Sequence, residues 1–288
     1  MNLAQQLLNG IVLGHAYALL AIGWTVLLGV ARLVNFGHGQ MYMLGAFVTW
    51  YAGARLGMPY LAAGAMAITA GMVIGYIMQR IMLRLTLKQD LVTIMIVTLG
   101  FGYVLQGAAG LVFGSTGQIL ETPLSRIDIY WGDLWFTWQD IAIIVVAMLF
   151  FAALKYVIEH TGVGRIARMV AEDPALALLS GINVKRVYLG VFAFEGAAVA
   201  LAAVMVAPRT PILTSMGFDE VIITFAVVVL GGIGSIAGSY FAGLALGLFT
   251  AFFGAFVAPA YTTAAAFAVL IAVLAIRPRG FAAAPGSR

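Results

Sequence analysis

The segment GRIARMVAEDPALALLSGINVKRV, residues 164–187, is a polar stretch in a chain that otherwise consists of long apolar runs. Asp173 and Pro174 predict a helix start, because an aspartate side chain accepts hydrogen bonds from free backbone N–H groups and proline suits the first helical position. A short apolar helix of about two turns should follow, and Gly181 should end it in a left-handed conformation. Such a helix is too short to cross a bilayer, so we expect it to lie at a membrane surface.

The overall composition indicates a polytopic membrane protein. Of the 288 residues, 63% are hydrophobic and 9% are charged, and the mean hydropathy is +1.06, whereas about 25% of the residues of a soluble domain are charged. The chain has no Cys, which excludes disulfides and cysteine-held metals, and its three His residues lie far apart in sequence, so we expect no metal site. We expect no cleavable signal peptide, because the N-terminal segment lacks a positively charged region.

The apolar runs predict an all-α fold with about eight or nine transmembrane helices in one domain, residues 1–288. The expected crossings are residues 7–30, 41–54, 59–81, 91–113, 140–158, 188–207, 221–236, 240–257 and 261–276, or eight of these with a re-entrant segment near Gly231. Residues 41–54 are too few for a crossing of about 20 residues, so this helix should begin within Asn35–Gln40. Two loops, residues 114–139 with three Trp residues and residues 208–220 with Asp219 and Glu220, should lie on the face opposite the polar loop 159–187.

The basic residues predict the orientation of the chain. If the crossings alternate, all fifteen Lys and Arg residues except Arg55, Arg126 and Arg209 lie on the face of the loop 159–187. By the positive-inside rule this face and the C-terminus are cytoplasmic, and the N-terminus is outside. The net charge of +4 therefore reflects loop asymmetry and gives no indication of nucleic-acid binding.

Two glycine-rich segments interrupt the apolar pattern and predict helix breaks. The glycines in question are Gly37, Gly39, Gly231, Gly232, Gly234 and Gly238. In a transporter, paired broken helices point to the substrate path, and Asn35, His38 and Gln40 in the first break could face it. Two other interpretations stay open, since small residues also let membrane helices pack closely, and Asn35 and His38 could simply cap the broken helix.

Glu195 is an ionisable residue inside the expected crossing 188–207. A charge at that depth costs about 2.5–3.5 kcal/mol on insertion scales and usually faces a cavity or a partner. Glu195 is therefore a candidate for the translocation pathway. It could instead be a neutral carboxyl hydrogen-bonded to a neighbouring helix, or a group hydrated near the interface.

Four motifs resemble the LivH-type permease subunits of ABC importers for branched-chain amino acids. They are VNFGHGQMYMLGAF (34–47), the segment 164–187, VLGGIGSIAG (229–238) and RPRGF (277–281), in the order of that family. The resemblance implies a permease in the bacterial inner membrane. Its implied partners are a second, LivM-like permease, two LivG/LivF-like ATPase subunits and a periplasmic solute-binding protein.

The resemblance also implies that the helix after Asp173 is a coupling helix, which fits a groove of an ATPase subunit. The implied apolar contacts come from Leu176, Leu178 and Leu179, and the orientation from Arg165, Arg168, Glu172 and Asp173, with Pro174 and Gly181 at the helix ends. The chain has no GxxxxGK[ST] motif, so we expect it to be no ATPase and to bind no cofactor, with ATP used by the partner subunits. The alternative is a basic cytoplasmic loop without a partner.

The chain departs from the family pattern at three positions. Glu195 stands where the family usually has a small or apolar residue, Gln40 where an acidic residue is common, and Ile223 where many relatives carry a basic one. The substrate therefore stays open among branched-chain amino acids, other amino acids, amides or urea, and small organic acids. The alternative function is an ion-coupled secondary transporter or channel, for which Glu195 would be the only intramembrane charge.

Overall fold

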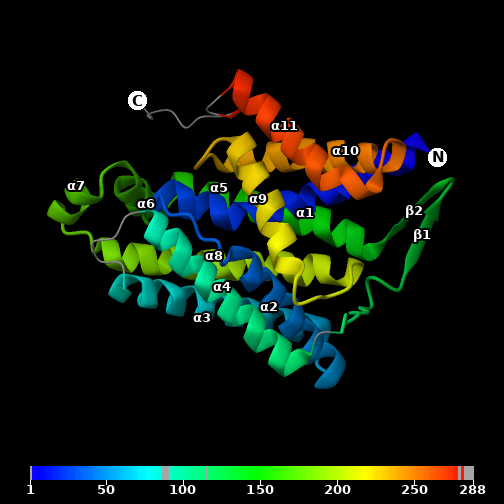
Figure 1. Cartoon of the computed structure of the whole chain (residues 1–288), viewed down its shortest axis with the longest axis horizontal. Helices are drawn as coiled ribbons and strands as arrows, with labels where there is room; N and C mark the ends of the chain where they lie inside the picture. The colour runs from blue at the N-terminus through cyan, green and yellow to red at the C-terminus, as the bar shows by residue number, and fades with distance from the viewer. Residues whose placement is uncertain (1, 86–90, 115, 278–279, 282–288) are drawn as a thin grey trace.

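The computed structural model describes residues 2–85, 91–114, 116–277 and 280–281, and these ranges are mostly helical (Figure 1). In chain order the elements are α1 Leu3–Val30, α2 His38–Trp50 with a π-helical end Tyr51–Arg55, α3 Tyr60–Leu85, α4 Leu91–Phe113, β1 Asp128–Trp131, β2 Leu134–Thr137, α5 Trp138–His160, α6 Gly162–Glu172, α7 Pro174–Leu179, α8 Val184–Val206, α9 Met216–Gly231, α10 Ile236–Phe256 and α11 Thr262–Ile276. The all-α polytopic membrane fold is confirmed. Pro278 and Arg279 of the RPRGF motif lie outside the described residues.

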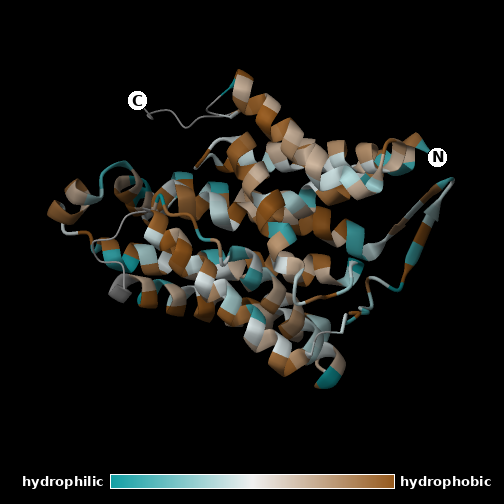
Figure 2. Ribbon diagram, viewed as in Figure 1, coloured by the Kyte–Doolittle hydropathy of each residue, from teal (hydrophilic) through white to brown (hydrophobic). Residues whose placement is uncertain are grey.

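Seven of the described helical segments are long and apolar enough to cross a membrane: α1, α3, α4, α5, α8, α10 and the segment Pro259–Ile276, which contains α11. Figure 2 shows hydrophobic residues along most of their length. Helix α2 has 13 residues, or 18 with its π-helical end, and α9 has 16; at 1.5 Å per residue these lengths are about 27 and 24 Å, less than the roughly 30 Å of a hydrocarbon core. We call these two the half-helices. The expected count of eight or nine crossings stays a prediction.

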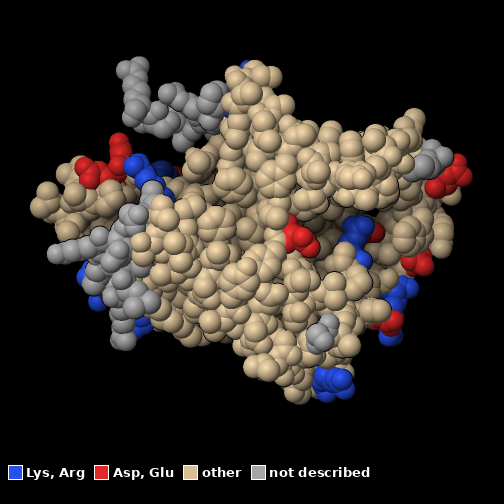
Figure 3. Space-filling view, in the orientation of Figure 1, with Lys and Arg blue, Asp and Glu red and all other residues tan. Residues whose placement is uncertain are grey.

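Hydrogen bonds between distant segments define the two ends of the bundle. Strands β1 and β2 form a hairpin at one end of the bundle, which we call the hairpin end. There Gln5 Nε2 donates to the Trp135 carbonyl oxygen and the Trp135 N–H donates to Gln5 Oε1, both at 2.8 Å. At the α7 end, Arg32 donates to the Ala171 carbonyl oxygen at 2.9 Å. Most of the charged side chains visible in Figure 3 lie at these two ends, as expected when the middle of the molecule lies in lipid.

Three segments differ from the sequence expectation. Residues 208–220, expected to form a loop, contain the start of α9, so Asp219 and Glu220 lie in its first two turns. The expected loop 114–139 contains the antiparallel hairpin β1–β2. The polar loop 159–187 holds two helices, α6 and α7, before α8 begins. The start of α9 is hard to find in the sequence because Gly217, Asp219 and Glu220 interrupt its apolar pattern.

Close backbone contacts at glycines hold the bundle together. The most extensive helix pairs are α1 with α10 and α3 with α8. A Cβ atom on Gly75 of α3 would overlap the Phe192 carbonyl oxygen of α8, and one on Gly247 of α10 would overlap the backbone of Gly14 in α1. Because lipid is as apolar as the helices, such close van der Waals packing supplies much of the association energy.

The predicted break glycines occupy different kinds of position. Gly232 and Gly234 have φ values of 95° and 82° and lie in the turn between α9 and α10. Gly37 is the residue that precedes α2. The remaining three, Gly39, Gly231 and Gly238, lie within the half-helices or at the start of α10, where a Cβ atom would overlap neighbouring backbone. They permit close packing and do not form the bends themselves.

We expect Gly75→Val to destabilise the bundle by about 1–3 kcal/mol or more, because the new side chain must push α3 away from α8. The measurement is the thermal unfolding midpoint in detergent, compared with that of wild type. Gly100→Val in α4 is the matched control, since a Cβ atom there meets nothing within 4 Å. Equal midpoints for the two variants would contradict the packing argument.

Candidate functional site

The break after α1 brings polar groups into the interior of the bundle. Arg32 has a φ of 54°, and the chain then runs without helical structure until α2 begins at His38. Asn35 Oδ1 accepts a hydrogen bond from the Gly37 N–H at 2.9 Å, and Thr98 Oγ1 of α4 accepts one from the Phe36 N–H at 3.1 Å. These two bonds satisfy backbone groups that the break releases from helical pairing.

Asn35, His38 and Glu195 form a hydrogen-bonded group that we call the buried polar cluster. Asn35 Nδ2 lies 3.1 and 3.0 Å from the two carboxylate oxygens of Glu195, and His38 Nδ1 lies 2.9 Å from Oε1. All three residues are 0% exposed. Glu195 belongs to α8, so the cluster joins the start of α2 to a helix about 160 positions later in the chain.

The geometry fits a carboxylate that accepts from both neighbours. With Glu195 ionised, its oxygens only accept hydrogen bonds, and His38 then donates through Nδ1. The Trp24 ring stacks on His38, with centroids 5.3 Å apart and planes 13° apart. Glu195 also lies beside the first residue of α2, where the helix dipole favours a negative charge.

The cluster decides between some of the interpretations left open by the sequence. Complete burial excludes a Glu195 hydrated at the interface, and its bonds match a carboxyl group paired with a neighbouring segment. Asn35 does cap the chain at the break, through the Gly37 N–H. A position of Asn35, His38 and Glu195 beside a substrate path stays a prediction.

Gln40 lies apart from the cluster, although the sequence grouped it with Asn35 and His38. Its side chain is 0% exposed, and neither Oε1 nor Nε2 has a hydrogen-bond partner within the described ranges. A Cβ atom on Gly217 would lie 2.5 Å from Gln40 Oε1. The amide therefore lies against the start of α9.

Sequence reasoning missed several buried polar groups on α1, α2 and α9. They are Trp24, Tyr42, Glu220 and Thr224, each with a buried polar atom that lacks a hydrogen-bond partner among the described residues. The spacing of Glu220 and Thr224, four apart and hence on one helix face, was an available signal. Assigning Glu220 to a loop concealed it.

At the α7 end, the short helix after Asp173 is present as predicted. Asp173 Oδ1 accepts from the N–H groups of Ala175 and Leu176 at 2.8 and 3.1 Å, and Gly181 has a φ of 83°. Ala177 packs inward with 1% exposure, whereas Leu176, Leu178 and Leu179 are 61%, 63% and 85% exposed. Three leucines thus point away from the chain on one small helix.

The charged residues around α7 have different environments. Arg168 of α6 donates to the Ile158 carbonyl oxygen at the end of α5, and Asp173 caps α7. Arg165 and Glu172 are exposed on α6. The Arg168 contact holds α6 against the end of α5, while the roles of these four residues toward a partner stay predictions.

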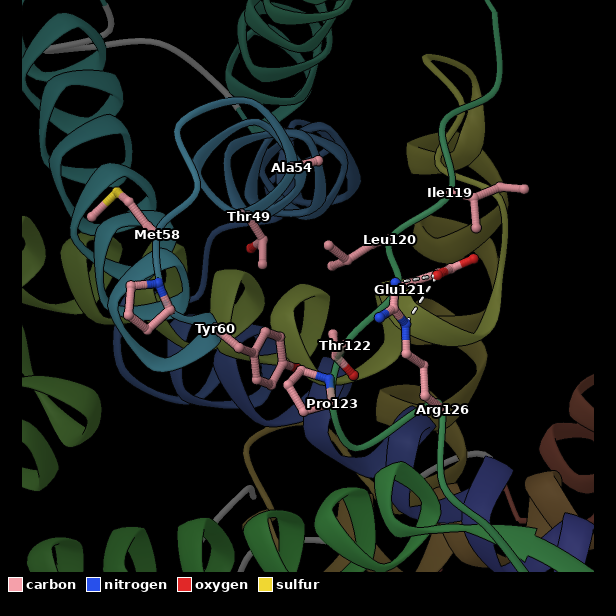
Figure 4. A pocket seen from close by; sticks show the side chains of 12 residues that line it. Thr49, Ala54, Met58, Tyr60, Ile119, Leu120, Glu121, Thr122, Pro123 and Arg126 are labelled. Atoms are coloured by element: carbon pink, nitrogen blue, oxygen red, sulfur yellow. Dashed lines mark hydrogen bonds and ion pairs between the residues drawn. The ribbon is translucent and has the colours of Figure 1, made fainter.

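A cavity of about 520 Å³ lies at the hairpin end (Figure 4). Its lining includes Thr49, Tyr60 and the ion pair in which Arg126 Nε and Nη2 donate to Glu121 Oε2 at 3.0 and 2.6 Å. The buried polar cluster does not line it. Among the residues that the structure describes, no three His, Cys, Asp or Glu side chains group in a way that could hold a metal ion.

Comparisons with known proteins give a consistent family match. The family model described as "Branched-chain amino acid transport system / permease component" matches residues 6–274. The chain is 32% identical to the high-affinity branched-chain amino acid transport system permease protein LivH of Escherichia coli (strain K12), and also to BraD of Pseudomonas aeruginosa, over 98% of this chain and 96% of each relative. It is 26% identical to LivM of Escherichia coli, over 76% of this chain and 57% of LivM. No solved structure matches the chain.

Removal of the Glu195 carboxylate should destabilise the fold. We expect Glu195→Leu to lower the free energy of unfolding by about 1–3 kcal/mol for each of the two donors that it leaves unpaired, on Asn35 and His38. Glu195→Gln keeps one acceptor oxygen and should cost less. The thermal unfolding midpoint in detergent measures both, with Glu159→Leu at an exposed carboxylate of α5 as control. If Glu195→Leu and Glu159→Leu unfold at the same temperature, the cluster has no stabilising role.

Proposed function

This chain belongs to the permease-component family of branched-chain amino acid transport systems, and on that premise we propose that it is the membrane-spanning subunit of an ABC importer. The observation that carries the proposal is the family match along nearly the whole chain. A second support is α7, whose three exposed leucines are suited to a groove in a separate subunit. The sequence lacks the phosphate-binding motif of an ATPase, so a partner must supply the energy.

We place the protein in the bacterial inner membrane with the α7 end in the cytoplasm. Basic residues of that end support this orientation: Arg32, Arg165, Arg168, Lys185 and Arg186, all exposed. The N-terminus and the β1–β2 hairpin would then lie outside, where a periplasmic solute-binding protein can reach them. The C-terminus would be cytoplasmic.

The second permease would pack over α9. Figure 3 shows a small acidic spot over this half-helix, with basic and further acidic atoms to its right, and Asp219 of α9 is exposed. A carboxylate facing lipid is costly, so this face suits a protein partner or an aqueous route. The similarity to LivM as well as to LivH suits a pair of related permeases. Two ATPase subunits would bind from the cytoplasm, one of them on α7.

A displacement of α7 would be transmitted to the interior of the bundle by α8. Residues 180–183 connect α7 to α8 directly, and Glu195 of α8 is hydrogen-bonded to Asn35 and His38 at the start of α2. Closure of the ATPase subunits on α7 would therefore tilt α8 and pull on α2. In this mechanism the buried polar cluster transmits movement from the ATPase subunits to the translocation pathway. Gln40 would lie beside that pathway.

The proposed substrates are branched-chain amino acids or a related small polar solute. The relatives LivH and BraD are named for branched-chain amino acid transport, and a binding protein would select the solute before delivery. An ion-coupled carrier has less support, because Glu195 is already paired within the chain.

Leu178→Asp should abolish or strongly weaken co-purification of an ATPase subunit from membranes, because a charge replaces an apolar contact that would be buried in the complex. The readout is the ratio of ATPase subunit to permease after affinity purification. Ile127→Asp is the matched control, since Ile127 is exposed to a similar degree at the opposite end of the molecule. If no ATPase accompanies the wild type, the importer assignment fails.

Vesicles that contain the permease with its partner subunits should take up radiolabelled leucine only when ATP and the binding protein are both supplied. Uptake that instead follows a proton or sodium gradient without ATP would favour a secondary transporter. A vesicle preparation carrying Leu178→Asp is the control, and its ATP-driven uptake should be lost.

A further inference from the structure

Helices α5 and α8 carry the segment that contains α6 and α7. Both run between the hairpin end and the α7 end of the bundle, in opposite directions, and α6 and α7 connect them at the α7 end (Figure 1). Helix α1 packs against both of them, whereas α5 and α8 contact each other much less. The way in which α5 and α8 move relative to each other therefore depends on a few separate contacts.

Two side-chain contacts join the start of α5 to the end of α8. Gln139 Nε2 donates to the Met205 carbonyl oxygen at 2.6 Å, and Gln139 is 0% exposed. Asp140 Oδ1 lies 2.7 Å from Nη1 of Arg209, in the 3₁₀ turn that follows α8. The other carboxylate oxygen of Asp140 accepts from the Thr137 N–H at 2.8 Å. One aspartate therefore caps α5 and also ties it to α8.

A backbone bridge adds a third contact at the same end. The Gln118 N–H donates to the Ile212 carbonyl oxygen at 3.0 Å, and the Ile212 N–H donates to the Gln118 carbonyl oxygen at 2.8 Å. Ile212 is buried in the connection between α8 and α9, and α9 begins soon afterwards at Met216. We call the two side-chain contacts and this bridge the outer clamp.

Helices α5 and α8 also meet halfway along their length. The rings of Phe150 in α5 and Phe194 in α8 stack with their centroids 6.0 Å apart, and Phe194 precedes Glu195 of the buried polar cluster. The two helices are thus joined at three depths, by the α6–α7 segment, by this ring pair and by the outer clamp. A pair of helices held at both ends and in the middle should move as one body.

The ion pair of the outer clamp is costly to separate. The side chains of Arg209 and Asp140 are 35% and 13% exposed. Separation would leave the Asp140 carboxylate largely buried without its counter-charge, and loss of one partner of a buried pair is more costly than the pair itself is stabilising. We therefore expect the two segments to stay together while the bundle changes shape.

We propose that Gln139, Asp140 and Arg209 are positioning residues of the transport cycle, which make the outer ends of α5 and α8 follow a displacement of α7. The proposal rests on the importer function. Through the bridge and the short connection to α9, residues 114–127 and the start of α9 would follow as well. Because coupling between two sites is reciprocal, the outer clamp would also carry the effect of a docked binding protein from the outer face to the ATPase subunits.

The first test uses vesicles that contain the full complex. Arg209→Gln removes the ion pair and leaves the cap that Asp140 forms on α5. Leucine uptake per ATP hydrolysed and the stimulation of hydrolysis by the binding protein should both fall about fivefold or more, the lower end of typical coupling between distant sites. Basal ATP hydrolysis and the amount of co-purified ATPase should stay near wild type, whereas loss of a merely stabilising contact would lower all four. Arg209→Lys keeps the charge and should recover part of the coupling.

The matched control is Arg126→Gln. It breaks an exposed ion pair with Glu121 at the same end of the molecule, within a single loop, and it should behave like wild type. Wild-type coupling in Arg209→Gln would overturn the role of the outer clamp and leave the importer function standing. Absence of ATP-driven uptake in the wild type would overturn the importer function and this proposal with it.

A second test covers the case in which Arg209→Gln assembles poorly. The chain has no native Cys, so Gln118→Cys combined with Ile212→Cys gives a single pair that can be oxidised. Hydrogen-bonded antiparallel pairs have Cα atoms about 5.5 Å apart, within the range that a disulfide spans. Because the two segments move together, uptake by the oxidised protein should equal that of the reduced protein. The single variant Gln118→Cys controls for the oxidant. Uptake that is lost on oxidation and regained on reduction would show that the segments must separate, and would overturn the proposal.

Discussion

The backbone contact between Gly39 and Gly217 is the constraint on which the centre of the molecule depends. It joins the first turns of the two half-helices, where a side chain on either glycine would overlap the other backbone. Helix N-termini carry partial positive charge and free N–H groups, so bringing two of them together requires nearby negative groups. Glu195 beside α2 and Glu220 within the first turns of α9 provide them.

The half-helices also explain why so many polar residues occur in a chain that is 63% hydrophobic. A helix that ends inside the membrane leaves backbone groups that must be paired by the protein itself. Asn35 and Thr98 pair them at the first break. The buried polar cluster then fixes the break to α8, whose first turn follows the α7 segment directly. Packing at the centre and the α7 end of the molecule are thus joined by one chain of contacts.

Helix α7 shows how much local sequence can specify. Six residues would not form a stable helix alone, but the Asp173 cap, Pro174 at the first position and burial of Ala177 against the rest of the loop hold it in place. The three exposed leucines are not buried within this chain. A surface of this kind is explained more readily by a partner than by stability.

The sequence by itself determined the membrane class, seven long apolar helical segments and the capped helix α7, because hydropathy and capping depend on residues that are near one another in the chain. It also pointed to Asn35, His38 and Glu195 as polar residues in unusual places, but not to their contact. Only the tertiary structure decided that Glu195 pairs with Asn35 and His38, that Gln40 lies apart, and that Glu220 belongs to a helix. These outcomes depend on how helices up to about 200 residues apart are rotated about their axes and how deep they lie in the bundle. Glycine packing between the helices sets both, and it leaves no periodic signal in the sequence.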